Sequence, residues 1–149
     1  MSSQRYNLSL KNGKAMIDGK LVTTNIYVKY ETINLISEKN FESDETIDCK
    51  NLLILPGVID SQVHFREPGL EGKENLESGM LAAVSGGVTA IFEMPNTNPL
   101  TITPETIADK LERARKGAWS DYAFYLGGTM RTSSHLSEWE NLKGVCGIK

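Results

Sequence analysis

The order of hydrophobic and polar residues changes near residue 51. Before that point, short runs such as YNLSL, KLVTTNIYVKY and TINLIS follow one another. The pairs Asn12-Gly13 and Asp18-Gly19 favour hairpin turns between such runs, because these residue types tolerate the positive φ angles that tight turns need. The pattern therefore predicts a small antiparallel β-domain over residues 1–51.

After residue 51, continuous apolar runs alternate with amphipathic segments. The runs NLLILPGVID, VTAIFEMP, DYAFYLGG and GVCGIK are typical of strands buried on both faces. KENLESGMLAAVS repeats apolar residues at helical spacing before Gly86-Gly87, and Thr103-Pro104 joins an N-cap to a proline at the first helical position. We expect a shorter helix around SSHLSEWENLK. The predicted fold class is thus α/β.

This alternation of strands and helices is typical of a parallel sheet with right-handed crossovers. Two closures are compatible with it: a small doubly wound domain, or part of an eight-stranded barrel. The doubly wound fold suits a chain of 149 residues, but its last strand would lack a covering helix. A (β/α)8 barrel needs about 250 residues. We therefore predict that residues 52–149 are the amino-terminal part of a (β/α)8 TIM-type barrel, and that the chain is truncated.

Composition narrows the function classes. The net charge is −3 and no basic stripe is present, which disfavours nucleic acid and anionic membranes as partners. No apolar run approaches the length of a membrane span, and the first residues lack the apolar core of a secretory signal. Cys49 and Cys146 are too far apart for a paired zinc motif and suit a reducing compartment. We expect a cytoplasmic protein.

Polar residues that could carry chemistry cluster at the predicted strand ends. They are Asp60, Gln62, His64 and Arg66 after the first strand of the barrel, Asn96 after the second, Gly127, Gly128 and Thr129 after the third, and Lys149 in the fourth. The carboxyl ends of barrel strands form the active-site face. We therefore expect these side chains to converge.

Two of these residues are candidates for binding a metal ion and an anion. His64 could bind Zn²⁺ through a ring nitrogen, or it could be a hydrogen-bonded polar residue. Arg66 could hold a carboxylate with two parallel hydrogen bonds. Its alternative is a structural salt bridge with Glu67 or Glu74.

Asn96 and Lys149 leave similar alternatives open. Asn96 could donate its amide to a ligand, or it could simply form a turn, as asparagine often does. A lysine in an apolar strand is costly unless its charge is lost or paired. Lys149 could therefore be converted to a carbamate, which is an anionic metal ligand, or it could simply lie near a chain end.

The segments PGVID, VHFREPG, GGVTA and EMPNTNP together resemble those of the dihydroorotases of the amidohydrolase superfamily. The resemblance covers the whole chain as the amino-terminal part of such an enzyme, with the early strands as the β-domain that flanks the barrel. It implies a hydrolase that interconverts N-carbamoyl-L-aspartate and (S)-dihydroorotate in pyrimidine biosynthesis. Hydantoinases and allantoinases, which share the barrel and the metal site, are the alternatives within the enzyme class.

The resemblance also assigns roles to residues. It implies substrate binding by His64, Arg66 and Asn96, with the last two on the substrate carboxylate. It implies one or two zinc ions held by His64, by a carboxylated Lys149 and at the position of Gln62. The catalytic aspartate that acts as general base is expected beyond residue 149. We further expect a homo-oligomer, with another pyrimidine-pathway enzyme as a candidate partner.

Gln62 departs from the family pattern, because it stands where the first histidine of the family's His-x-His metal pair is expected. Zinc prefers imidazole, thiolate or carboxylate to a neutral amide. One zinc could be lost or weakened, Gln62 could itself bind zinc or orient another ligand, or the protein could be a non-catalytic scaffold that keeps only the fold. Because His64, Arg66, Asn96 and Lys149 are all present, we favour an enzyme with an altered metal site.

Overall fold

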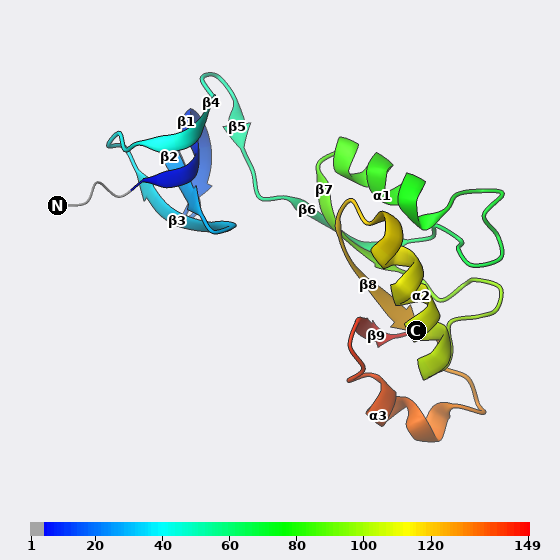
Figure 1. Ribbon diagram of the computed structural model, residues 1–149. Helices are drawn as coiled ribbons and strands as arrows, with labels where there is room; N and C mark the ends of the chain where they lie inside the picture. Colours follow the sequence, from blue (N-terminus) through cyan, green and yellow to red (C-terminus); the bar gives the residue numbers. More distant parts are fainter. Residues whose placement is uncertain (1–4) are drawn as a thin grey trace. The chain divides into compact units, whose positions relative to one another are not determined.

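The computed structural model describes residues 5–149, so the first four residues of the predicted domain 1–51 lie outside the described part. The chain divides into two compact units, residues 1–56 and 57–149 (Figure 1). In the described part, no helix is both long enough and apolar enough to cross a lipid bilayer.

The first unit is a five-stranded sheet. Its strands are β1 (Tyr6–Ile17), β2 (Lys20–Lys29), β3 (Thr32–Ser37), β4 (Ser43–Asp48) and β5 (Leu53–Ile54). The order is β3-β2-β1-β4, and β5 also pairs with β1. The pairs β1–β2 and β2–β3 are antiparallel, as predicted, whereas β4 and β5 join β1 in parallel.

One of the two predicted hairpin turns is confirmed and the other is wrong. Asp18 and Gly19 have φ angles of 48° and 74° and connect β1 to β2. Asn12 and Gly13 instead lie inside β1, where the register with β2 shifts between Leu10 and Gly13. The positive φ of Asn12 therefore forms a β-bulge and not a chain reversal.

Aromatic packing and buried hydroxyl groups hold this first sheet together. The rings of Tyr6 and Tyr27 lie 5.0 Å apart, and the Phe41 ring meets that of Tyr27 edge-on at 5.4 Å. The buried Ser9 hydroxyl bonds to the hydroxyl groups of Ser43 at 2.7 Å and Thr46 at 2.9 Å. The polar side chains of β1 and β4 thus satisfy one another where the strands run in parallel.

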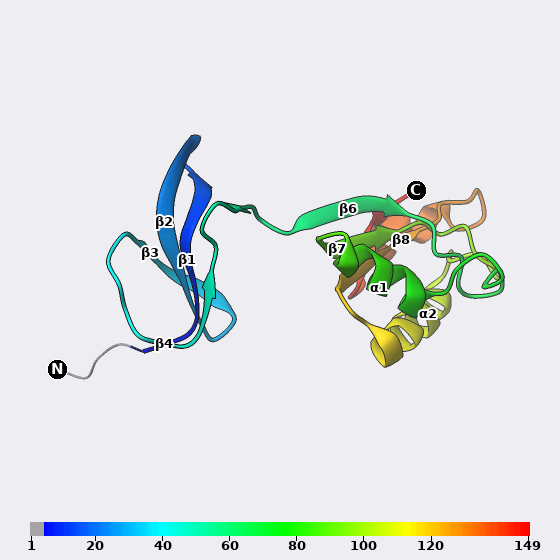
Figure 2. The same ribbon diagram turned by 90° about the horizontal axis from the view of Figure 1, so that it is seen from above.

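The second unit alternates strands and helices. Its elements are β6 (Val58–Val63), α1 (Leu76–Ser85), β7 (Val88–Glu93), α2 (Pro104–Gly117), β8 (Asp121–Leu126), the 3₁₀ turn η1 (Ser133–His135), α3 (Leu136–Trp139) and β9 (Val145–Ile148). The four strands form a parallel sheet in the order β6-β7-β8-β9, of which Figure 2 labels β6, β7 and β8. This succession is the predicted α/β pattern.

The apolar run of residues 51–60 does not form one buried strand as predicted. Leu53–Ile54 pairs with β1 in the first unit, whereas Val58–Val63 begins the second sheet as its edge strand. Val58 and Ile59 are 55% and 59% exposed among the described residues. Asp60 and Gln62 lie within β6 rather than after it.

α2 begins at the predicted cap Thr103-Pro104, and α1 begins at Leu76, three residues into the predicted segment KENLESGMLAAVS. Asn75 caps α1 by accepting a hydrogen bond from the Ser78 N–H, and Thr103 caps α2 in the same way through Thr106. Each cap satisfies a backbone N–H group that has no partner inside the helix. Gly86 is the C-cap of α1, directly after Ser85.

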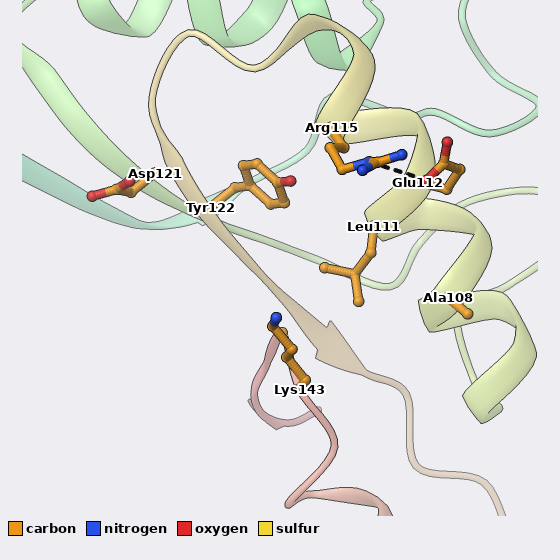
Figure 3. A pocket seen from close by; sticks show the side chains of 8 residues that line it. Ala108, Leu111, Glu112, Arg115, Asp121, Tyr122 and Lys143 are labelled. Atoms are coloured by element: carbon orange, nitrogen blue, oxygen red, sulfur yellow. Dashed lines mark ion pairs between the residues drawn. The ribbon is translucent and has the colours of Figure 1, made fainter.

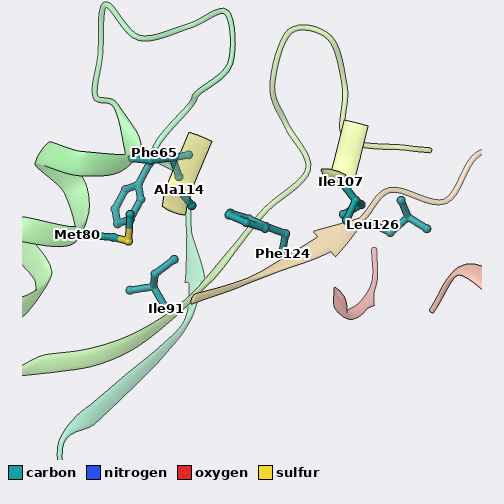
Figure 4. Packing of buried hydrophobic residues seen from close by; sticks show 8 residues of the cluster. Phe65, Met80, Ile91, Ile107, Ala114, Phe124 and Leu126 are labelled. Carbon is teal, nitrogen blue, oxygen red and sulfur yellow. The ribbon is translucent and has the colours of Figure 1, made fainter. Parts of the chain in front are cut away.

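Both helices bury their apolar faces against the sheet. The buried cluster comprises Phe65, Leu76, Met80, Ile91, Ile107, Ala114, Phe124 and Leu126 (Figure 4). Gly79 in α1 lies against the Phe65 ring, and a methyl group at this position would overlap the ring. Phe65 therefore anchors the loop after β6 to α1, and this loop carries His64 and Arg66.

Candidate functional site

The backbone of Arg66 is held in an uncommon conformation at the carboxyl end of β6. Its φ angle is 74°, in the left-handed region that non-glycine residues rarely adopt. The Arg66 N–H donates to Glu93 Oε1 at 3.2 Å, and the Arg66 carbonyl accepts from the Leu70 N–H at 3.1 Å. These bonds fix the backbone of the residue, and the guanidinium at the end of its side chain is held by a separate bond to the Asn96 carbonyl.

Two cationic side chains converge on Asn96, which follows β7. Arg66 Nη1 donates to the Asn96 backbone carbonyl at 3.4 Å, and Lys149 Nζ donates to Asn96 Oδ1 at 2.9 Å. Lys149 lies directly after β9, and its N–H donates to the Leu126 carbonyl of the neighbouring strand β8. The ends of three strands, β6, β7 and β9, thus contribute to one polar cluster.

A small cavity of about 200 Å³ lies beside this cluster. It is lined by Pro95, Asn96, Leu100, Ile102, Gly127, Gly128, Thr129 and Lys149. The predicted glycines after β8 are therefore next to Asn96 and Lys149. Their amides are already bonded, since Gly127 N–H donates to the Thr101 carbonyl and Gly128 N–H to the Lys149 carbonyl. These glycines shape the wall of the cavity rather than supply free donors.

The loops after β6 and β7 are joined to each other by their backbones. The Asn98 N–H donates to the Pro68 carbonyl at 2.8 Å, and the Met94 N–H donates to the Val63 carbonyl at 3.0 Å. Gly69 has a φ angle of 87°, and a methyl group there would overlap the Asn98 carbonyl oxygen. The glycine of the REPG segment is thus required for the close approach of the two loops.

Glu67 does not pair with Arg66, which was the alternative interpretation of the REPG segment. Its Oε2 accepts from the Leu76 N–H at the start of α1, and its Oε1 lies 3.6 Å from Arg113 Nη1 on α2. None of the ion pairs found within residues 5–149 includes Arg66. The Arg66 guanidinium therefore remains available to an anionic ligand.

His64 is partly buried and lies near these cations, and both features favour the neutral form of its imidazole. Burial lowers the pKa of the imidazole, and the positive charges of Arg66, Lys149 and Lys110 lower it further. Its buried Nδ1 has no hydrogen-bond partner among the described residues. A neutral imidazole is the form that binds a metal ion, so His64 fits the part of a zinc ligand.

Gln62 is exposed, and its N–H donates to the Asp60 carboxylate at 3.0 Å. Within residues 5–149, no three histidine, cysteine, aspartate or glutamate side chains lie close enough together to hold a metal ion. Lys149 could add a ligand only after losing its proton or becoming a carbamate. The donors near His64 therefore supply only part of a metal-binding site, and Gln62 is the weakest ligand among them.

Sequence reasoning missed two charged residues beneath the cluster. Glu93, at the end of β7, and Lys110, on α2, form an ion pair of 2.6 Å, and both side chains are completely buried. Burial raises the pKa of Glu93 and lowers that of Lys110, and each partner's charge opposes the shift of the other. The signals were a single carboxylate in the apolar run VTAIFEMP and a lysine on the same helical face as Ile107 and Ala114.

A larger cavity lies elsewhere, between α2 and the first residues of β8 (Figure 3). It has a volume of about 710 Å³ and is lined by Ala108, Leu111, Glu112, Arg115, Asp121, Tyr122, Lys143 and Gly144. Asp121 begins β8, whereas the polar cluster lies at the carboxyl ends of the strands. Glu112 and Arg115 bind each other at 3.3 Å. None of the predicted site residues lines this cavity.

Comparison with protein families gives a match to the Dihydro-orotase-like family over residues 51–145. A dihydroorotase of Thermococcus kodakarensis is 38% identical over 125 residues, which are 83% of this chain and 31% of that protein. A dihydroorotase of Bacillus anthracis is 40% identical over 141 residues, which are 92% of this chain and 33% of that protein. The chain thus spans about a third of the length of these curated relatives.

Solved structures show a similar fold. An L-hydantoinase (dihydropyrimidinase) from Arthrobacter aurescens superposes with a TM-score of 0.89 at 27% identity, covering 96% of this chain and 32% of that one. A dihydropyrimidinase from Brevibacillus agri gives a TM-score of 0.79 at 26% identity, with coverages of 94% and 32%. These neighbours are TIM-barrel proteins. The predicted fold, the first half of such a barrel after a small antiparallel sheet, is confirmed.

Proposed function

Since the chain belongs to the dihydroorotase-like family, we propose that the protein is a dihydroorotase, a hydrolase that interconverts N-carbamoyl-L-aspartate and (S)-dihydroorotate. The observation that carries this proposal is the convergence of Arg66 and Lys149 on Asn96. It provides a fixed guanidinium and an amide at the carboxyl ends of the strands, where barrel enzymes bind their substrates. We call Arg66 and Asn96 the clamp.

The clamp suits the carboxylate of dihydroorotate. A guanidinium presents donors in a planar fork that matches a carboxylate, and such charge-assisted bonds are stronger than neutral ones. Lys149 bonds to Asn96 Oδ1, which leaves the Asn96 Nδ2 group as the donor for a ligand. The hydantoinases among the structural neighbours are the alternative within the enzyme class. An unsubstituted hydantoin or dihydropyrimidine ring has no carboxylate, so the clamp favours the dihydroorotase activity.

The family is metal-dependent, and we propose zinc, as one or two ions. His64 is the proposed ligand in the described part, with Lys149 as a second after carboxylation and Gln62 as a weak neutral one. Bound zinc would lower the pKa of water and polarise the ring carbonyl. His64 would contribute a neutral ring nitrogen, and Arg66 and Asn96 would fix the substrate carboxylate. The general-base aspartate is expected beyond residue 149.

Gln62 supports a second candidate function, that of a non-catalytic scaffold. It is exposed and stands where the family has a metal histidine, and only one of the predicted metal ligands is an imidazole. A scaffold would keep the barrel start and bind another pyrimidine-pathway enzyme without turnover. The clamp argues for the enzyme, because a scaffold has no use for a fixed guanidinium and amide directed at a small anion.

We also propose how the domains of the chain are organised, how the protein assembles and in which compartment it is located. We propose that residues 52–149 begin the catalytic barrel and that residues 1–51 form a separate small β-domain. The substrate is a small molecule, and a homo-oligomer is the expected assembly. Because pyrimidine synthesis supplies soluble nucleotides, the cytoplasm is the proposed location.

The test is zinc content together with turnover. Purified protein would be analysed for zinc per chain after preparation with and without bicarbonate, and assayed with dihydroorotate, hydantoin and allantoin. Zinc that falls without bicarbonate, together with dihydroorotate hydrolysis, supports the enzyme with a carboxylated Lys149. Stoichiometric zinc that is independent of bicarbonate supports an enzyme in which this lysine stays unmodified. Absence of both zinc and turnover would replace the enzyme by the scaffold.

A further inference from the structure

The buried Glu93–Lys110 pair contacts both loops that carry the clamp. Glu93 Oε1 accepts from the Arg66 N–H at 3.2 Å, in the loop after β6. Lys110 Nζ donates to the Met94 carbonyl at 3.3 Å, two residues before Asn96 in the loop after β7. The ion pair itself joins the two contacts at 2.6 Å. An uninterrupted chain of polar contacts thus runs from the backbone of Arg66 to the segment that presents Asn96.

A gain in stability does not by itself explain why a completely buried ion pair is present here. Both side chains are completely buried, and the Lys110 ammonium lies 5.0 Å from the centre of the Phe124 ring. Replacing a buried ion pair by apolar residues of similar size is often neutral or stabilising, because the charges lose their hydration on burial. The charges therefore suit a role that apolar residues cannot fill, which is to bind backbone groups in fixed positions.

The Arg66 backbone is such a position. Its φ angle of 74° is unfavourable for a residue with a side chain and persists only where the surroundings hold it. The carboxylate of Glu93 is the acceptor for its N–H group. Without that acceptor the N–H would be left unsatisfied beneath the loop, and the residue could relax towards negative φ. The guanidinium would then leave the backbone in another direction.

We propose that Glu93 and Lys110 are positioning residues that set the separation of Arg66 and Asn96, and thereby the preference of the site for a ring that carries a carboxylate. Glu93 acts through the Arg66 amide and Lys110 through the Met94 carbonyl. This inference rests on the proposed function only for the identity of the ligand. The positioning of Arg66 by Glu93 is a property of the chain that can be measured without turnover.

The experiment compares two double variants that differ only in whether residue 93 keeps an oxygen acceptor. Glu93→Gln with Lys110→Met removes both charges and keeps an oxygen acceptor at position 93. Glu93→Leu with Lys110→Met removes the charges and the acceptor. The control is Glu112→Gln with Arg115→Met, which removes an exposed ion pair from the same helix. All are made in the whole chain and studied by amide NMR.

The first readout is the Arg66 amide. We expect its proton resonance to move upfield and its hydrogen exchange to accelerate by at least about tenfold in Glu93→Leu/Lys110→Met, because an unbonded amide exchanges freely. Rescue by Glu93→Gln/Lys110→Met separates positioning from general loosening of the core, which would affect both variants. An Arg66 amide that responds equally in both variants, or in neither, overturns the proposal.

The second readout is ligand binding, with dihydroorotate and dihydrouracil as probes that differ by the carboxylate. We expect Glu93→Leu/Lys110→Met to weaken dihydroorotate binding by roughly ten- to a hundredfold, the usual effect of losing a residue that orients a binding group. Dihydrouracil binding should change by less than about threefold, since it does not engage the clamp. Equal losses for the two probes would contradict the role in carboxylate preference.

The two proposals fail in different ways. If the unsubstituted chain binds neither probe while the Arg66 amide responds as expected, the proposed function fails and the positioning of Arg66 stands. If Glu93→Leu/Lys110→Met does not fold, the Glu93→Gln double variant still tests the Lys110 arm. Its Met94 carbonyl should lose a donor, which shifts the carbonyl ¹³C resonance upfield. An unchanged Met94 resonance would refute that arm.

Discussion

The two sides of the candidate site are built differently. On the side of Arg66 and Asn96, hydrogen bonds join the loops to each other, to β9 and to a buried ion pair. On the side of Gln62, the one hydrogen bond described above runs within β6, to Asp60, and β6 is an edge strand in the described sheet. Within the described residues, the side chains that would hold an anion therefore have hydrogen-bond partners, whereas the bond described for Gln62 involves its backbone N–H.

This difference shows that anion binding and metal binding depend to different degrees on the rest of the protein. The clamp uses contacts that are complete within residues 57–149, so its geometry is a property of this unit. A metal centre needs several donors in one place, and within residues 5–149 no three histidine, cysteine, aspartate or glutamate side chains lie that close together. We therefore expect substitutions in the buried contacts that support the clamp to lower the free energy of unfolding strongly, and substitutions at Gln62 to change it little.

The largest expected effect comes from removing half of the buried pair. Lys110→Met leaves the Glu93 carboxylate buried without a partner and should lower the free energy of unfolding by about 3–5 kcal/mol. Urea denaturation at pH 7 measures this. Arg115→Met, which breaks an exposed pair on the same helix, should cost less than about 1 kcal/mol. Similar losses in both variants would contradict the importance of burial.

The same variant has a defined pH dependence. Burial raises the pKa of Glu93 above its ordinary value of 4.5, and Lys110 opposes this shift. Without Lys110, the folded protein should hold the Glu93 proton still more tightly than the unfolded chain does. The destabilisation of Lys110→Met is therefore expected to be smallest below pH 4.5 and to grow as the pH rises through the folded-state pKa. Urea denaturation at pH 4 and 7 would show it, and a constant difference would count against it.

A smaller loss is expected where the two loops meet. Gly69→Ala places a methyl group against the Asn98 carbonyl at a positive φ angle, and overpacking of this kind costs about 1–3 kcal/mol. Gly72→Ala is the control in the same loop, because no atom lies within 4 Å of the added methyl group. Thermal unfolding of the two variants would separate them. Equal transition temperatures would show that the loops are not in close contact.

Asn96→Ala tests ligand binding more than folding. Asn96 is exposed, so we expect a change in the free energy of unfolding of less than about 1 kcal/mol. Loss of its amide should weaken dihydroorotate binding by about tenfold, since a hydrogen bond to a charged group contributes about 1.5–3 kcal/mol. Calorimetric titration measures the affinity. Asn98→Ala is not a suitable control, because Asn98 packs on Gly69; Asn141→Ala, just after α3, is.

The smallest effect on stability is expected at Gln62. Gln62→His changes an exposed side chain, so the free energy of unfolding should move by less than about 0.5 kcal/mol. Zinc content should rise, because imidazole is a far better zinc ligand than a carboxamide. Elemental analysis of both proteins after dialysis gives the comparison. Unchanged zinc content would mean that position 62 is not next to the metal.

The elements with local signals were predicted correctly from the sequence. The caps at Thr103 and Gly86 fixed helix ends because they act through neighbouring residues. The break in residues 51–60 was missed, although Pro56-Gly57 marked it, because an apolar run alone does not tell which sheet each half joins. Asn12-Gly13 was misassigned since the same positive φ serves a turn or a bulge, and only the pairing with β2 decides between them.

The candidate site was predictable only in its outline. Strand order placed Arg66, Asn96 and Lys149 at one edge, and the structure brings these three together. The Glu93–Lys110 pair depends on how α2 lies on β7, which no local pattern encodes. A lysine beside apolar helix positions usually extends its amine to solvent, so Lys110 alone gave no reason to expect a buried charge.

Burial of the Glu93–Lys110 pair also constrains how the sequence of this chain can change. The two codons are separate, so charge at both positions must be lost in successive steps. Either intermediate carries one unpaired charge in the core and would be removed by selection before the second substitution arrived. We therefore expect the two positions to covary among homologues, with both charges present or both absent. A lineage without the pair is expected to have passed through an intermediate in which another substitution compensated for the single charge.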